Sequence, residues 1–393
     1  MEVLGAGVLK GKGGAPDREI TLLTTVHGRL AGYATVDGTK VAVVRDRATR
    51  GREALSAIAF QDLNANRVKS ARDFLRTMGT FELAFNWFYA DDRDIAMIST
   101  GRTPQRAAGV ELALPTRGTG EWDWRGFLAA KAHPQAINPS GGAILNWNNK
   151  PSRSWPASDS QWSYQSVHRV DLLPSALPAG KMTLPDVVRA MNVAATQDLR
   201  ATHVWPAVAQ VLAVTAAPSE RAARAKQVVD AWKAAGGSRL DRDLDGWIDD
   251  PGTAVLDAAW PSIARTVLQP ALGDQLVSDL EKLVPIDDAA NSGGSSYGAG
   301  WYGYVEKDLL TQLERPVARR YSTRYCGGGD VQACSRSLWA ALDAAAGRLG
   351  AEPWRADARA ERISFGLLPE TTRWVNRPTF QQVITFRSHR RRN

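Results

Sequence analysis

The hydrophobic pattern of this chain changes type once, near residue 172, and this change limits the folds that the chain can adopt. Before that point apolar and polar side chains alternate as in strands, and Asp37-Gly38 lies between two such runs in LAGYATVDGTKVAVV. An Asp-Gly pair between alternating runs is the strongest short signal of a β-hairpin. A second pair of β-rich runs flanks Asp91 to Asp94. Strands followed by a block of helices indicate an α+β protein.

Helical spacing dominates the middle of the chain. The stretches TLPDVVRAMNVAATQDLRATHVWPAVAQVLA, PSERAARAKQVVDAWKAAGG and CSRSLWAALDAAAGRLG place apolar residues at helical intervals, and NRVKSARDFLRTMG predicts one earlier helix. Near the C-terminus RWVNRPTFQQVITFR alternates again and predicts a strand that returns to the first sheet. We therefore expect a strand-rich part over 1–172, a mainly helical part over 173–350 and a closing segment over 351–393.

The composition is typical of a globular protein without membrane spans. Apolar residues make up 44% and charged residues 23% of the 393 residues, and no run reaches the length of about 18 apolar residues that a membrane helix needs. The N-terminal residues lack the charged start, apolar block and cleavage site of a signal peptide. The net charge of +8 is dispersed except in the tail RSHRRRN, for which we expect a solvated terminus. Neither a membrane nor nucleic acid is therefore an expected partner.

The chain contains two cysteines, Cys326 and Cys334, in the stretch CGGGDVQAC. The three glycines make this short loop flexible enough to close, so we expect a disulfide if the compartment is oxidising. Two free thiols are the alternative. A zinc site is not favoured, because no histidine lies near the pair.

The stretch DRDLDGWIDDPG is similar to a calcium-binding loop. Asp241, Asp243 and Asp245 occupy positions 1, 3 and 5, Gly246 permits the sharp turn at position 6, and Asp249 follows at position 9. Carboxylates at alternate positions can converge on one hard cation. The loop departs from the pattern at position 12, where a glycine stands in place of a bidentate glutamate. A structural calcium site is the favoured interpretation, and an acidic surface turn between helices is the alternative.

Three asparagines and two tryptophans crowd into GGAILNWNNKPSRSWPASD, residues 141–159. Asparagine is disfavoured in strands and in helix interiors, because its amide competes with the backbone for hydrogen bonds. Tryptophan is costly to leave in water. Such a cluster indicates either a tight structural turn or side-chain amides directed at a ligand.

Several stretches, taken in order, resemble the β-chain of the penicillin acylase family, whose members are N-terminal-nucleophile (Ntn) hydrolases. They are TTVHG, NWFYADDRDIAMISTGRTP, GTGEWDWRGF, INPSGGAILNWNNKPSRSWPASD, QDLRA and NRPTFQQV. The NWNN-x-P block followed by PASD is the most specific of them. The similarity covers most of residues 20–260 and then thins towards the closing stretch. It implies an incomplete αββα four-layer core with a large helical insertion and a returning C-terminal strand.

The resemblance also implies a chemistry. Family members cleave amides with an N-terminal serine whose own α-amino group acts as the base, and a side-chain amide donates to the oxyanion. Asn148 matches that amide, and Arg169 matches an arginine that orients the amide network near the nucleophile. Asp159 matches a calcium ligand, and Leu112 falls where a backbone carbonyl completes the calcium shell. The alternatives are a turn cap for Asn148, a plain ion-pair partner for Arg169 and a helix cap for Asp159.

This sequence departs from the family pattern at the nucleophile, because it begins Met-Glu and offers no N-terminal Ser, Thr or Cys. We expect a C-terminal portion of a β-chain, whose partners are the upstream α-chain, the first part of the β-chain and a small N-acylated substrate. The family acts on linear amides such as the acyl side chains of β-lactams or acyl-homoserine lactones, in the periplasm or outside the cell. We expect this chain to be inactive alone. A non-catalytic, calcium-stabilised binding or assembly protein is the alternative function.

Overall fold

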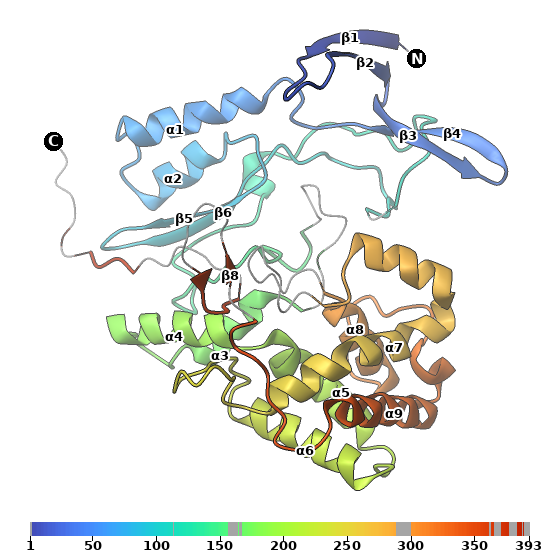
Figure 1. Cartoon of the computed structure of the whole chain (residues 1–393). Helices are drawn as coiled ribbons and strands as arrows, with labels where there is room; N and C mark the ends of the chain where they lie inside the picture. Colours follow the sequence, from blue (N-terminus) through green and yellow to red (C-terminus); the bar gives the residue numbers. More distant parts are fainter. Residues whose placement is uncertain are drawn as a thin grey trace. The chain divides into compact units, whose positions relative to one another are not determined.

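A computed structural model describes residues 2–112, 114–155, 164, 167–287, 300–360, 363–364, 371–376, 383–386 and 388. The chain divides into two compact units (Figure 1), one comprising residues 1–164 and 386–393 and the other residues 165–385. All strands longer than two residues that the structure describes belong to the first unit, and most of the helices to the second. The mixed α and β content agrees with the predicted class.

The first unit begins with a four-stranded antiparallel sheet in the order β1-β2-β3-β4. Its strands are β1 (Glu2–Leu9), β2 (Arg18–Thr25), β3 (Gly28–Val36) and β4 (Thr39–Arg45). The hairpin predicted at Asp37-Gly38 is confirmed: it joins β3 to β4, and both residues have positive φ angles, of 48° and 76°. Positive φ at both central residues is the geometry that a two-residue hairpin prefers. All eight residues of β1 are exposed.

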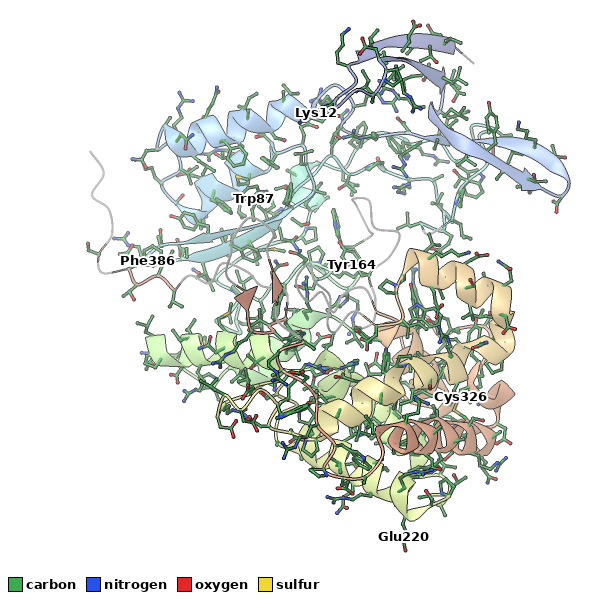
Figure 2. The ribbon with its side chains drawn as sticks, viewed as in Figure 1. Lys12, Trp87, Tyr164, Glu220, Cys326 and Phe386 are labelled. Carbon is green, nitrogen blue, oxygen red and sulfur yellow. A yellow bond between two sulfur atoms is a disulfide. The ribbon has the colours of Figure 1, made fainter. Side chains whose placement is uncertain are left out.

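A second sheet of three antiparallel strands packs with two helices into a separate core. The elements are α1 (Ser56–Asn64), α2 (Ala71–Met78), β5 (Asn86–Ala90), β6 (Ile95–Ser99) and β7 (Gln135–Ile137). Ser70 caps α2 by accepting the backbone N–H of Asp73. The core cluster contains Ala59, Phe74, Met78, Phe81 and Ile98, against which Trp87 packs (Figure 2). The helix predicted from NRVKSARDFLRTMG and the strand pair around Asp91 to Asp94 are thus confirmed.

The second unit is mainly helical. Its longer helices are α4 (Leu184–Thr196), α5 (Trp205–Leu212), α6 (Glu220–Ala234), α7 (Gly252–Leu283), α8 (Tyr302–Gln312) and α9 (Val331–Leu349). Shorter elements are η3 (Arg169–Asp171), α3 (Leu172–Ala176), the π-helical turn η4 (Arg200–Val204), η5 (Cys326–Gly329), β8 (Ile363–Ser364) and β9 (Thr371–Thr372). Within the described ranges, no helix is both long and apolar enough to span a bilayer.

Four fully buried tryptophans form much of the core of the helical unit: Trp205, Trp232, Trp260 and Trp301. Each indole N–H donates to an acceptor, and three of these acceptors are backbone carbonyls at the ends of helices or in loops. Buried indoles usually pair their N–H in this way, because an unpaired buried donor costs free energy. The tryptophans therefore fix helix ends and connecting segments to one another.

The closing strand predicted from RWVNRPTFQQVITFR is wrong where the structure describes that stretch. Residues 373–375 and 383–386 form no strand, and Asn376 makes only an isolated bridge. The backbone N–H of Asn376 donates to the carbonyl of Ala195, and its side-chain amide donates to Ala194 and Gln197. These bonds at the end of α4 replace the expected ladder. Residues 377–382 lie outside the described part of the chain.

Candidate active site

The amide loop, residues 146–149, carries the three asparagines that the sequence singled out. The side chain of Asn149 accepts the backbone N–H of Trp147 at 2.9 Å and donates to the carbonyl of Lys150 at 3.0 Å. Asn149 therefore shapes the turn from within.

Asn86, the first residue of β5, ties the amide loop to the second sheet. Its side-chain NH2 donates to Oδ1 of Asn146 at 2.9 Å and lies 3.5 Å from the carbonyl oxygen of Asn149. The loop is thus fixed to a strand end rather than left as a free connection. Asn86 was not predicted as a site residue, although it stands in the NWFYADD stretch on which the resemblance rests.

Asn148 differs from its neighbours in the amide loop. Its backbone is left-handed, with φ 61°, a conformation that asparagine tolerates better than most residues. Its side chain is exposed, and no hydrogen bond engages the Asn148 amide within the described residues. An amide NH2 donates without titrating, so this group can bind an anionic oxygen at any pH at which the fold persists.

Arg169 belongs to the second unit, where it begins the short turn η3. The turn is closed by Asp171, whose carboxylate accepts the backbone N–H of His168 at 2.9 Å. The Arg169 side chain is 5% exposed. The capped turn therefore fixes the backbone from which the Arg169 side chain extends.

Of the calcium ligands implied by the resemblance, Asp159 lies outside the described residues. Leu112 lies in a turn next to the hydrogen bond from the Leu114 N–H to the Glu111 carbonyl.

The aspartate loop, residues 241–249, brings three of its four predicted carboxylates together. Oxygen atoms of Asp241, Asp243 and Asp249 lie within 4.8 Å of one another. Asp245 lies outside this group and accepts the backbone N–H of Trp247 at 2.8 Å. Gly246 has φ 94° at the sharp turn, a conformation that favours glycine.

The aspartate loop also shows which ligand atoms a cation would find. Oδ2 of Asp241 accepts the N–H of Gly246, whereas its Oδ1 is buried and has no hydrogen-bond partner among the described residues. Asp249 is ion-paired with Arg242, which would compete with a cation. Carboxylate oxygens are the ligands that calcium takes, so the donor set fits calcium, and Asp241 offers a buried oxygen to it.

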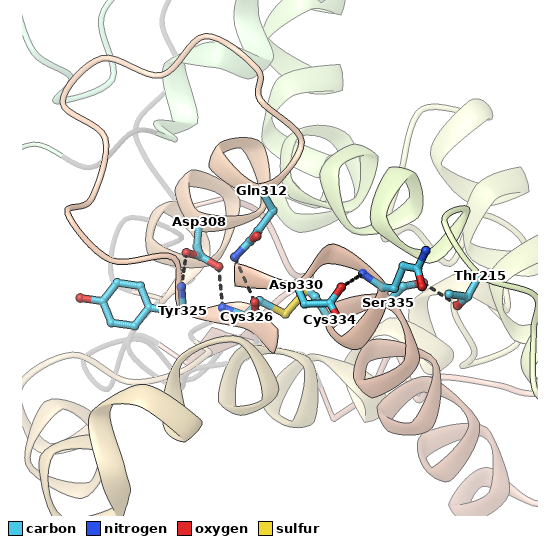
Figure 3. Close-up of a disulfide and its surroundings, with 9 residues drawn as sticks. Thr215, Asp308, Gln312, Tyr325, Cys326, Asp330, Cys334 and Ser335 are labelled. Carbon is cyan, nitrogen blue, oxygen red and sulfur yellow. Dashed lines mark hydrogen bonds between the residues drawn. A yellow bond between two sulfur atoms is a disulfide. The ribbon is translucent and has the colours of Figure 1, made fainter. Parts of the chain in front are cut away.

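Cys326 and Cys334 are joined by a disulfide, and both residues are fully buried (Figure 3). The carboxylate of Asp308 accepts the backbone N–H groups of Tyr325 and Cys326 at 2.8 and 2.9 Å. Gln312 donates to the carbonyl of Cys326 at 3.0 Å. Burial raises the pKa of the Asp308 carboxyl, against the lowering effect of these two N–H donors. The disulfide and the acid together attach the η5 turn to α8 and α9.

A buried ion network in the helical unit was not predicted from the sequence. Its members are Asp198, Arg200, Arg239, Asp257 and Asp287. The Arg200 side chain is completely buried and reaches Asp198, Asp257 and Asp287 at 2.5 to 2.6 Å. Burial opposes ionisation of Asp257, but the guanidinium groups of Arg239 and Arg200 outweigh it and lower the Asp257 pKa to about 2. The signal available in the sequence was the charged pair of QDLRA amid apolar residues.

The family model for penicillin amidase matches residues 7–385. The chain therefore belongs to the penicillin amidase family. The match extends well beyond residues 20–260, to which the sequence similarity was expected to be largely confined.

Individual relatives agree with this membership. Penicillin G acylase of Escherichia coli is 30% identical over 254 residues, which are 63% of this chain and 29% of that protein. Acyl-homoserine lactone acylase QuiP of Pseudomonas syringae pv. tomato is 32% identical over 45% of this chain and 21% of its own length. The chain thus spans less than a third of the curated relatives that it matches.

A solved structure of a thermostable penicillin G acylase from Alcaligenes faecalis has the same fold. The TM-score is 0.75 at 22% identity, and the match covers 96% of this chain and 68% of that chain. The fold similarity extends over nearly all of this chain, while about a third of the solved chain has no counterpart in it.

Proposed function

We propose that this chain carries part of the active site of a penicillin-acylase-type amidohydrolase, with Asn148 as a donor to the oxyanion. The observation that carries the proposal is that the three asparagines of the amide loop differ in their hydrogen bonding. Asn146 and Asn149 are held by hydrogen bonds, while Asn148 is exposed in a left-handed conformation with its amide unengaged within the described residues. A donor that no internal hydrogen bond engages is available to a developing oxyanion.

The reaction is hydrolysis of a linear amide. Attack on the acyl carbon places negative charge on the carbonyl oxygen, and the Asn148 NH2 donates to that oxygen as the charge develops. The names of the relatives support an N-acyl compound as substrate, such as the acyl side chain of a β-lactam or an acyl-homoserine lactone.

The nucleophile comes, in this proposal, from a further polypeptide that completes the fold. Support comes from the relatives, of which this chain spans less than a third, and from the first sheet. Val3, Val8 and Val26 on that sheet are 65%, 56% and 95% exposed. Exposed valines on a sheet are suited to a covering partner. We propose the upstream portion of an acylase precursor as that partner, and an oxidising compartment such as the periplasm for the disulfide.

Calcium is proposed as a structural ion in the aspartate loop, supported by the buried Oδ1 of Asp241, which has no hydrogen-bond partner in the part of the chain that the structure describes. A calcium site is equally compatible with the second candidate function, a calcium-stabilised binding or assembly protein without catalysis. Calorimetry with calcium chloride, combined with an activity assay, separates the two functions. Calcium binding without activity in the completed complex supports the second.

The test of the proposed function is co-expression. The upstream polypeptide, identified from the DNA immediately 5′ of the Met1 codon, is produced together with this chain, and hydrolysis of a chromogenic aryl-acetyl amide is measured. We expect turnover from the complex and none from either polypeptide alone. Substantial turnover by this chain alone would contradict the proposed division of the active site. A complex that forms but remains inactive would contradict the enzymatic function.

A further inference from the structure

A histidine and a tryptophan close the long segment that contains the amide loop. His133 and Trp155 stand at its two ends, each only 6% exposed. Their ring centroids are 5.0 Å apart with an interplanar angle of 51°. Asn148 lies within the segment that this contact closes. A packed pair at the ends of a loop restricts its conformations, because the ends no longer move independently.

His133 also bonds to the strand beside the amide loop. Its Nδ1 lies 2.9 Å from the carbonyl oxygen of Ser99, the last residue of β6. A carbonyl can only accept, so Nδ1 carries the proton and donates. The backbone N–H of Ser99 in turn donates to the carbonyl of Pro134 at 2.8 Å. The imidazole is therefore fixed in both position and tautomer.

Ser99 connects His133 to the amide loop through the sheet. In the β5–β6 ladder Ser99 stands opposite Asn86, and Asn86 holds Asn146 and Asn149 through its side chain. His133 is thus connected to the loop through its hydrogen bond to Ser99, the Ser99–Asn86 strand pair and the contact of the Asn86 side chain with the loop. The Trp155 contact provides a second path, through the chain that follows the loop.

We propose that His133 is a positioning residue for the amide loop. It holds the end of β6 with Nδ1 and the end of the loop segment with its ring face, and together these contacts fix the direction of Asn148. Its effect on hydrolysis rests on the proposed function, whereas its effect on the loop does not.

Hydrogen exchange measured by mass spectrometry tests the effect on the loop. His133→Leu replaces the imidazole with an apolar side chain of similar bulk and removes the donor. His133→Asn retains an NH2 near the position of Nδ1. We expect exchange of residues 143–150 to be about tenfold faster in the leucine variant, at unchanged rates in α9. The asparagine variant keeps the donor but loses the ring contact with Trp155, so we expect its exchange to lie between that of the wild type and that of the leucine variant.

Two exchange results would overturn the proposal. Unchanged exchange of residues 143–150 in His133→Leu would show that the bond to Ser99 does not hold the loop. Equal acceleration in α2 and in the loop would show that His133 is only a packing residue of the first unit.

Kinetics of the co-expressed complex test the second part. We expect His133→Leu to lower kcat about tenfold with KM unchanged, and His133→Asn, which keeps the donor but not the ring, to recover part of that loss. An unchanged kcat in His133→Leu, in a complex that Asn148→Ala inactivates, would overturn the positioning role and leave the proposed function intact. An Asn148→Ala complex with full activity would instead refute the proposed function, and the exchange measurement would still decide whether His133 holds the loop.

Discussion

The four-stranded sheet and the helical unit differ in how far they bury their apolar side chains. The helical unit encloses four tryptophans completely and satisfies each indole N–H. The sheet leaves all of β1 exposed, together with valines on the turn and strands that follow. A region that buries its apolar groups is stabilised by its own residues, whereas a sheet that exposes them is suited to a covering layer. The helical unit thus has a core of its own, although leucines such as Leu283 (81% exposed) remain on its surface, whereas β1 contributes no buried residue.

The largest expected loss of stability follows from substitution in the buried ion network. Such a substitution should destabilise the helical unit far more than substitution of an exposed residue destabilises the sheet. Arg200→Met leaves Asp198 buried without its main partner, and we expect a loss of about 3–5 kcal/mol in the free energy of unfolding. Urea denaturation followed by circular dichroism measures it. Arg221→Met, which breaks the exposed pair with Asp343, is the matched control and should cost under about 1 kcal/mol. Equal losses of stability in Arg200→Met and Arg221→Met would contradict the expected difference between the buried network and an exposed ion pair.

Calcium should stabilise the helical unit through the aspartate loop. At a calcium concentration 100-fold above the dissociation constant we expect about 2.7 kcal/mol of stabilisation, removed by a chelator. Thermal unfolding with and without calcium chloride measures this effect, and Asp241→Asn should abolish it. Asp245→Asn is the control, since Asp245 lies outside the carboxylate cluster. A calcium response that survives in Asp241→Asn would contradict the assigned loop.

Acid should weaken the helical unit through Asp257. Its pKa is lowered from 3.8 to about 2 in the folded state. A depressed folded pKa contributes stability above the unfolded pKa, and this stability is lost as the pH falls from about 4 to 2. Allowing for partial solvent screening, the loss is about 1–2 kcal/mol. Unfolding measured across this pH range should show the loss in the wild type and a flatter profile in Asp257→Asn, while an identical profile in the variant would contradict the assignment.

The smallest effect on stability is expected at the exposed sheet. Val8→Thr and Val26→Thr should change the free energy of unfolding by at most about 0.5 kcal/mol, because neither side chain is buried. The same substitutions should weaken association with the co-expressed upstream polypeptide, as measured by co-purification. If a variant with both substitutions co-purified with the upstream polypeptide at the wild-type level, the interpretation of this sheet as an interface would be contradicted.

Local signals made much of the secondary structure predictable. The Asp37-Gly38 hairpin depends on two adjacent residues, and α6 begins directly after Ser219, whose side chain caps the helix by accepting the N–H of Ala222. The closing strand failed because alternation alone cannot show that Asn376 bonds to the end of α4. The ion network could not be predicted because Arg200 meets Asp257 and Asp287 across 57 and 87 residues.

The candidate site was predictable in part. The NWNN stretch pointed to Asn148, but only the structure shows that Asn146 and Asn149 are hydrogen-bonded while the Asn148 amide has no partner among the described residues. His133 gave no signal in the sequence, because its partner Ser99 is set by strand pairing and Trp155 by the closure of a long segment. Residues that act through backbone geometry emerge only when the fold is known.

The most direct test of the account is the kcat of the co-expressed complex with Asn148→Ala. Removal of one oxyanion donor should lower kcat by about 10²–10³-fold, with co-purification of the two polypeptides unchanged. Asn192→Ala, at an exposed position on α4, serves as the matched control and should keep wild-type kcat. A kcat for Asn148→Ala within about twofold of the wild type would contradict the assignment of this amide to the oxyanion.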